Sequence, residues 1–170
     1  MKIFLLGMMG CGKSYWATKL SRKLKLPKYD LDQLIESVED RSIQQIFKET
    51  GEEHFRKMES IVLKWFADKD EFILATGGGT PCYHNNMEWM NKEGITIWLD
   101  EPVEVLVKRL MPALSQRPLI ANLTEEKLKV YLGKKTQERR SFYQQAKFTL
   151  SGASITESNL LSLIKENSYA

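Results

Sequence analysis

The stretch GMMGCGKS, residues 7–14, combines the residue types that bind phosphate groups. It matches the pattern G-x-x-x-x-G-K-[ST], between an apolar run and a helical pattern. In such a loop the glycines let backbone N–H groups point at phosphate oxygens, and the helix start adds the positive end of its dipole. Lys13 would reach the β and γ phosphates, and the Ser14 hydroxyl would bind Mg²⁺. The stretch predicts a nucleotide site of the kind that motors, switches and kinases share; a glycine-rich turn between core elements is the alternative.

Two carboxylates, Asp30 and Asp32, lie near the end of an expected strand over residues 28–32. If the strand continues, the two side chains share a face; if a helix begins here, they diverge but stay near the phosphate end of the sheet. One could hold the Mg²⁺ shell through water, while the other orients or deprotonates a substrate hydroxyl. An Asp pair can also merely cap a helix.

Several arginines could bind anionic groups. Arg56 stands in HFRKMES among acidic residues, where a surface ion-pair ladder is the alternative. Arg117 stands in the proline-flanked SQRPLI, which is typical of a mobile lid and could bring a positive charge to a transferring phosphoryl group; an exposed loop residue is the alternative. Of Arg139 and Arg140, one could face a carboxylate while its neighbour, about 100° round the helix, faces water.

Three consecutive glycines, residues 77–79, follow the apolar run EFILAT. Such a run costs conformational entropy unless the backbone must approach a ligand closely or adopt positive φ. We therefore expect these glycines to form a second wall of the site.

The elements that must position these residues follow from apolar runs that alternate with helical patterns. Strands are expected over residues 2–7, 28–32, 71–76, 95–100 and 147–151. Helices are expected over residues 12–26, 31–68 with breaks near 40–41 and at 51, 85–91, 102–110, 124–143 and 159–166. Ser42 with Gln45 forms a capping box, and Thr124 is a helix cap. This order predicts an α/β protein with a parallel sheet, helices on both faces, and ligands at the carboxyl ends of the strands.

Length and composition limit the class of protein. The 170 residues, without repeat or linker, predict a single domain. A net charge of +3 is too small to indicate a nucleic-acid partner. The two cysteines, Cys11 and Cys82, form no disulfide framework and fit a reducing compartment, and no apolar stretch approaches the roughly 20 residues that span a bilayer. We expect a cytoplasmic protein without nucleic-acid or membrane partners.

Taken together, GMMGCGKS, DLD, FRKMES, TGGGT, RPLI and RRSFY resemble the motifs of the shikimate kinase family in order and approximate spacing, over residues 2–150. The resemblance implies a three-layer P-loop kinase fold of the nucleoside-monophosphate-kinase type, with a five-stranded parallel sheet. It implies one kinase domain over residues 1–170, with the phosphate loop at 7–14, a substrate-binding helical region at about 31–60 and a lid at about 111–124. The implied activity is Mg²⁺-dependent transfer of the γ-phosphoryl of ATP to the 3-hydroxyl of shikimate, for chorismate and aromatic amino acid biosynthesis, by a monomer.

The resemblance also implies roles for individual residues. ATP would be held by the loop backbone, by an adenine contact and by the lid, that is by Gly10, Cys11, Gly12, Lys13, Ser14, Tyr15, Arg109 and Arg117. Mg²⁺ would be held by Ser14 and Asp30. Shikimate would be bound by Asp32, Arg56, Gly78, Gly79 and Arg139. The catalytic residues would be Lys13, Asp32 as candidate base, and Arg117.

Two other functions stay open at this point. A related small-molecule kinase, such as one for gluconate, would share the loop and the sheet. A non-catalytic nucleotide-binding regulator would keep the fold but lose the acceptor-side residues. The arginine pair and the glycine run favour shikimate over gluconate, and the presence of Asp32, Arg56 and Arg139 counts against a regulator.

Overall fold

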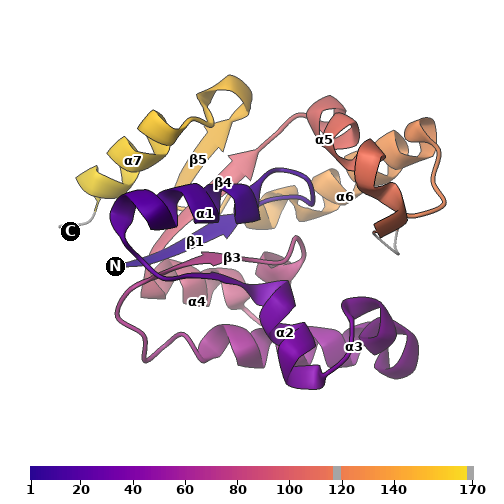
Figure 1. Cartoon of the computed structure of the whole chain (residues 1–170), viewed down its shortest axis with the longest axis horizontal. Coiled ribbons are helices and arrows are strands. Elements are labelled where there is room, and N and C mark those ends of the chain that lie inside the picture. The colour runs from indigo at the N-terminus through magenta and orange to yellow at the C-terminus, as the bar shows by residue number, and fades with distance from the viewer. Residues whose placement is uncertain (117–119, 168–170) are drawn as a thin grey trace.

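A five-stranded parallel sheet, in the order β2-β3-β1-β4-β5, forms the centre of the molecule (Figure 1). The computed structural model describes residues 1–116 and 120–167. The strands are β1 (Lys2–Leu6), β2 (Lys28–Asp30), β3 (Phe72–Ala75), β4 (Ile95–Asp100) and β5 (Phe148–Ser151). All four neighbouring pairs are parallel, which confirms the predicted fold class.

Helices connect the strands. They are α1 (Lys13–Leu24), α2 (Leu31–Glu39), α3 (Ile43–Lys64), α4 (Asn86–Glu93), α5 (Val103–Leu110), α6 (Glu125–Tyr143) and α7 (Glu157–Glu166). Short 3₁₀ turns are η1 (Thr80–Cys82), η2 (Met111–Gln116) and η3 (Gly152–Ser154). The two predicted caps are confirmed, because Ser42 forms a reciprocal capping box with Gln45 and the Thr124 side chain accepts from the Lys127 amide.

Two boundaries differ from the sequence-based expectation in an instructive way. The second strand ends at Asp30 rather than at residue 32, because α2 begins at Leu31, which is buried together with Ile35 one turn later. Asp32 therefore lies in the first turn of a helix, and the second of the two predicted geometries is the one found. At the other end of the chain, α7 begins at Glu157, two residues early, because Thr156 caps it.

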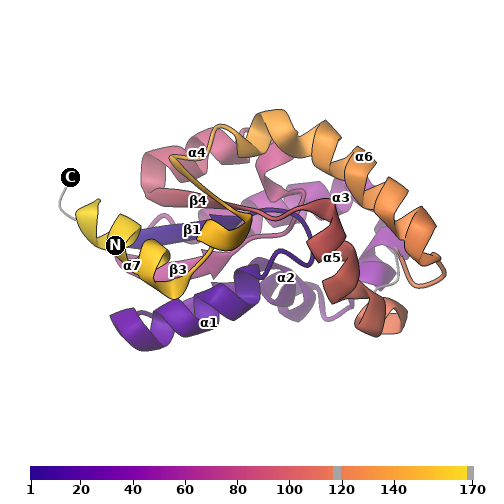
Figure 2. The same ribbon diagram turned by 90° about the horizontal axis from the view of Figure 1, so that it is seen from above.

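Helices cover both faces of the sheet (Figure 2). Alternate residues of β1 belong to different cores: Ile3 and Leu5 pack with residues of α1 and α7, whereas Phe4 and Leu6 pack with residues of α3 and α4. β1 is the central strand, buried on both sides. The loop that follows it is thus anchored by two cores at once.

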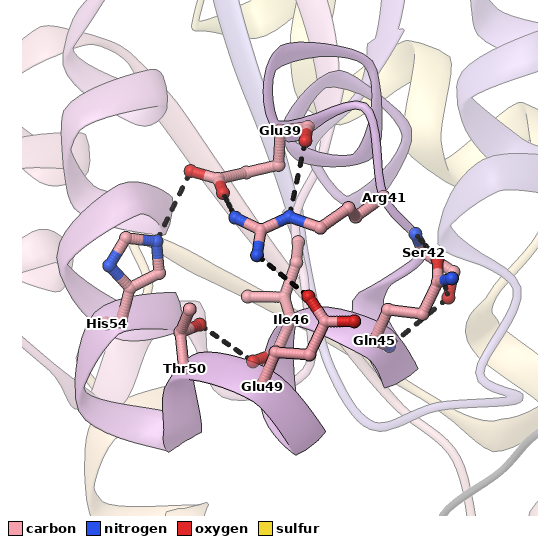
Figure 3. Close-up of polar contacts among 8 residues, drawn as sticks. All are labelled: Glu39, Arg41, Ser42, Gln45, Ile46, Glu49, Thr50 and His54. Carbon is pink, nitrogen blue, oxygen red and sulfur yellow. Dashed lines mark hydrogen bonds and ion pairs between the residues drawn. The ribbon is translucent and has the colours of Figure 1, made fainter.

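The helix pair α2 and α3 is held by polar contacts around a kink (Figure 3). Gly51 adopts φ 81° and ψ 172° inside α3, at the predicted break. On one side of the kink, Arg41 Nη1 donates to Glu49 Oε2 at 3.1 Å; on the other, His54 Nε2 lies 3.3 Å from Glu39 Oε1. Arg41 and Glu39 also form an ion pair. Both halves of α3 are therefore tied to the end of α2.

Candidate active site

The phosphate loop runs from the end of β1 into α1, as predicted. Gly7, Gly10 and Gly12 all have positive φ, which disfavours any other residue. A Cβ on Gly7 would also lie 2.8 Å from the carbonyl oxygen of Leu99. The loop conformation therefore depends on its glycines.

The ammonium group of Lys13 lies against the backbone of the phosphate loop. Its Nζ donates to the carbonyl oxygens of Gly7 at 2.8 Å and Met8 at 2.9 Å. The amides of Lys13, Ser14 and Tyr15 belong to the first turn of α1, where an N–H has no acceptor within the helix. These amides and the ammonium group form a cradle for phosphate oxygens.

The side chains of Cys11 and Tyr15 lie in opposite environments, one buried and one exposed. The Cys11 amide donates to the Met8 carbonyl at 3.2 Å and its side chain is buried, so Cys11 shapes the loop from inside. The Tyr15 ring is 56% exposed and packs edge-on against Trp16. The side chain of Tyr15 therefore lies along the surface of α1, next to Trp16.

Ser14 and Asp30 meet at the mouth of the loop. The Ser14 hydroxyl donates to Asp30 Oδ2 at 2.6 Å. Both groups are hard oxygen donors of the kind that Mg²⁺ prefers, and this ion takes its other ligands from phosphates and water. The described part of the chain holds no cluster of three or more His, Cys, Asp or Glu that could bind a metal, and a nucleotide-bound Mg²⁺ needs none. The two residues fit the predicted ion.

A cleft of about 1110 Å³ is lined by α2, α3, the glycine run and α6. Its charged and backbone lining includes Asp32, Arg56, Glu59, Gly77, Gly78, Gly79 and Arg139. Apolar side chains complete the lining, among them Ile43, Phe47, Phe55 and Ile120. The structure thus brings together all the residues that the sequence assigned to the acceptor.

Asp32 has an unusual acidity for an aspartate. Its side chain is open to the cleft, yet protein surrounds the carboxyl closely enough that desolvation is the main cause raising its pKa, to about 6. The negative charges of Glu59 and Asp30 raise the pKa further, whereas Lys13 and Arg56 lower it. A carboxylate with this pKa is a better proton acceptor near neutral pH than an ordinary aspartate.

Arg56 is buried rather than part of a surface ladder. Its Nη1 donates to Glu59 Oε2 at 2.9 Å, and its Nε and Nη2 both donate to Glu52 Oε1, at 3.2 and 3.1 Å. Glu59 is fully buried and also accepts from Thr80 Oγ1 at 2.5 Å. The sequence-based analysis missed Glu59 as a site residue, although its i,i+3 spacing from Arg56 was a usable signal.

The glycine run is required by close approach and not by positive φ. None of residues 77–79 has positive φ. Each lies against a different charged group of the site: a Cβ would come 2.9 Å from Asp32 Oδ1 at Gly77, 3.0 Å from Arg139 Nη1 at Gly78, and 2.6 Å from Arg56 Nη2 at Gly79. Side chains at these positions would displace the acceptor groups.

The end of α6 places Arg139, and not its neighbour, at the cleft. Arg139 lines the cleft, whereas Arg140 Nη2 lies 3.6 Å from Asp100 Oδ2 beside a second, smaller pocket. One turn further on, the Tyr143 hydroxyl donates to the Gly78 carbonyl at 2.5 Å. α6 is thereby joined to the glycine wall.

The last two predicted residues, Arg109 and Arg117, are among those that the resemblance assigned to ATP. Arg109 Nη2 donates to Glu101 Oε1 at 2.8 Å and its Nη1 to the Gly10 carbonyl at 3.3 Å, which sets the guanidinium beside the phosphate loop. Arg117 lies outside the described residues.

The chain matches proteins of one family along nearly its whole length. The family model described as shikimate kinase matches residues 9–167. A shikimate kinase of Phocaeicola vulgatus is 42% identical over 146 residues, which cover 86% of this chain and 83% of that protein. One of Parabacteroides distasonis is 36% identical over 160 residues, covering 94% and 92%.

Solved structures agree with these matches. A shikimate kinase from Bacteroides thetaiotaomicron superposes with a TM-score of 0.91 at 33% identity, covering 99% of this chain and 98% of that one. One from Acinetobacter baumannii, solved in complex with shikimate, gives 0.87 at 29% identity, covering 99% and 95%. A deoxyadenosine kinase from M. mycoides, at 0.60 and 17% identity with full coverage of both chains, shares the fold alone. With its phosphate loop and acceptor cleft, the chain belongs to the shikimate kinase family, and it is an ATP-dependent kinase.

Proposed function

We propose that the protein transfers the γ-phosphoryl group of ATP to the 3-hydroxyl of shikimate, in the biosynthesis of chorismate and aromatic amino acids. The observation that carries this proposal is the convergence of Asp32, Arg56 and Arg139 on one cleft. An acceptor with one carboxylate and several hydroxyls needs cations for the former and a hydrogen-bond acceptor for the latter. The relative from Acinetobacter baumannii, which has bound shikimate, supports the same substrate.

On the donor side, the loop amides and Lys13 bind the phosphates of ATP. Ser14 and Asp30 would hold Mg²⁺, which when bound neutralises charge on the β and γ phosphates. Arg109, fixed beside the loop by Glu101, lies against the adenine. Arg117 brings a further positive charge to the transferring group.

On the acceptor side, Arg56 and Arg139 bind the carboxylate of shikimate, and Gly78 and Gly79 leave room for its ring. Asp32 accepts a hydrogen bond from the 3-hydroxyl and takes its proton as the oxygen attacks the γ phosphorus. The bond from that phosphorus to the β-phosphate oxygen breaks, and ADP leaves. A pKa of about 6 leaves Asp32 mostly ionised at pH 7, ready for this role.

The proposal extends to the organisation of the protein. Residues 1–170 form one kinase domain in which residues 31–60 bind the acceptor and residues 111–124 act as a lid. Because one chain supplies every residue assigned a role, a monomer is sufficient. The free thiols Cys11 and Cys82 fit a cytoplasmic location. No helix within residues 1–116 and 120–167 is long and apolar enough to cross a membrane.

The test is the release of ADP from MgATP with and without shikimate, and with gluconate as a comparison acceptor. We expect release that depends on shikimate, with a product heavier by one phosphoryl group. Preference for gluconate would support a related small-molecule kinase instead. Binding of ATP without turnover of either acceptor would support a non-catalytic regulator.

A further inference from the structure

The guanidinium of Arg56 is in contact with an aromatic ring that has no role in the reaction described above. Tyr83 follows η1, and the centroid of its ring lies 4.4 Å from Arg56 Cζ. This is within the range of a cation–π contact. The Tyr83 hydroxyl donates to Glu52 Oε1 at 3.1 Å, the oxygen that also accepts from Arg56 Nε and Nη2. One side chain thus touches both the cation and its counter-charge.

The other contacts of Arg56 do not fix its orientation by themselves. Glu59 binds only Nη1, and an ion pair through one nitrogen leaves the guanidinium plane free to turn about that bond. Glu52 binds two nitrogens, but its side chain is 55% exposed, and exposed carboxylates hold their partners weakly. A second ring, that of Phe55, lies farther away, with its centroid 5.1 Å from Arg56 Cζ. Tyr83, at 4.4 Å, provides the nearer face against which the planar guanidinium is held.

The position of Tyr83 also suits this role. Its side chain is 37% exposed, so core packing does not account for a large aromatic residue here. It lies four residues after Gly79, whose backbone meets the same guanidinium. The segment that forms the wall of the cleft therefore also carries the ring that orients the arginine.

We propose that Tyr83 is a positioning residue, whose ring holds the Arg56 guanidinium in the orientation that binds the acceptor carboxylate. This inference rests on the proposed function, since it concerns the carboxylate of shikimate. The proposal predicts that Tyr83 contributes to the binding affinity only of an acceptor that carries the negatively charged carboxylate.

The experiment compares Tyr83→Leu, which removes the ring, with Tyr83→Phe, which keeps it and loses only the hydroxyl. We expect Tyr83→Leu to raise the KM for shikimate about 3- to 10-fold, the range of a partly exposed cation–π contact. Tyr83→Phe should restore most of the affinity, and the KM for ATP should stay within about twofold in both. Tyr83→Met provides a second ring-free variant if Tyr83→Leu fails to fold.

The methyl ester of shikimate, which is neutral, separates a positioning role from general damage to the cleft. Its affinity, measured as an inhibition constant, should be the same in wild type and Tyr83→Leu. Equal losses for the ester and for shikimate, or no loss for shikimate, would overturn the proposal. Trp65→Leu is the matched control, because Trp65 is an aromatic residue at the far end of α3, 53% exposed, and should change neither constant. Failure of the wild type to turn over shikimate would instead contradict the proposed function.

Discussion

The two halves of the site are built in opposite ways. The phosphate-binding part of the donor half is a continuous stretch, residues 7–15, that acts through backbone amides, one lysine and one hydroxyl, and Asp30 and Arg109 join it from elsewhere in the chain. The acceptor half consists of side chains from α2, α3 and α6 against the backbone of residues 77–79. A backbone cradle suits a phosphate chain that many proteins bind, whereas a particular acid needs side chains in a particular arrangement. We therefore expect acceptor-side substitutions to change catalysis and shikimate affinity while leaving ATP affinity intact.

The sharpest test of this separation is Asp32→Asn. Removing the proton acceptor should lower kcat by about 10² to 10⁴-fold, the usual contribution of general base catalysis. The Kd for ATP, measured by calorimetry, should stay within about twofold. Normal turnover would show that Asp32 neither orients nor deprotonates the hydroxyl.

Arg56→Ala should have the next largest effect. Loss of a charge-assisted contact with the carboxylate should raise the KM for shikimate by about 100-fold. The same change leaves the buried Glu59 carboxylate without its cationic partner, so the free energy of unfolding should fall by about 3–5 kcal/mol. Chemical denaturation measures this loss, and steady-state kinetics with each substrate varied gives the two KM values. Equal increases for shikimate and ATP would count against a carboxylate clamp.

Gly79→Ala tests whether backbone space is part of the acceptor half. The added Cβ would lie 2.6 to 2.8 Å from the Arg56 guanidinium and push it out of place. We expect a cost of about 2 kcal/mol, or about 30-fold in the KM for shikimate. Gly133→Ala in α6 is the control, because nothing lies within 4 Å of its Cβ. That variant should keep wild-type kinetics and gain stability of about 0.5–1 kcal/mol.

The smallest effect concerns pH. Because Asp32 titrates with a pKa of about 6, kcat/KM for shikimate should fall about tenfold between pH 7 and pH 5 as the base becomes protonated.

The same pKa shift predicts an effect on stability. The pKa of Asp32 in the folded state lies above the ordinary value of 3.8, so the folded state binds more protons than the unfolded state, and this group costs stability as the pH rises through 4 to 6. Asp32→Asn should therefore increase the free energy of unfolding at pH 7 relative to wild type. A decrease would contradict the cause assigned to the shift.

Much of the fold could be predicted because its signals are local. The apolar runs, the capping box at Ser42 and the cap at Thr124 each act over a few residues, and the structure confirms them. The start of α2 was also readable, since Leu31, Leu34 and Ile35 follow helical spacing. The expected strand, residues 28–32, overlapped the expected helix, which began at residue 31, and the structure resolves this overlap in favour of the helix.

The site was predicted unevenly for a physical reason. Helical spacing alone left Arg139 and Arg140 open, and only the family resemblance favoured Arg139; the structure then places Arg139 at the cleft. Similarly, the i,i+3 spacing of Arg56 and Glu59 is the same for an exposed ion pair as for a buried one, so the sequence could not show that this pair is buried. The burial of Glu59 depends on how α3 packs against η1, and the contact of Tyr83 depends on a loop 27 residues away from Arg56. Such contacts exist only in the folded chain.

The contacts of Lys13 with its own loop affect how the enzyme releases its product. The ammonium group is already solvated by two carbonyl oxygens, so binding a nucleotide exchanges these partners for phosphate oxygens instead of creating new contacts. Departure of ADP reverses the exchange and leaves the charge with partners at hand. We expect this exchange to lower the barrier to dissociation of ADP from the loop, so that the lysine that binds the phosphates of ATP also allows rapid turnover.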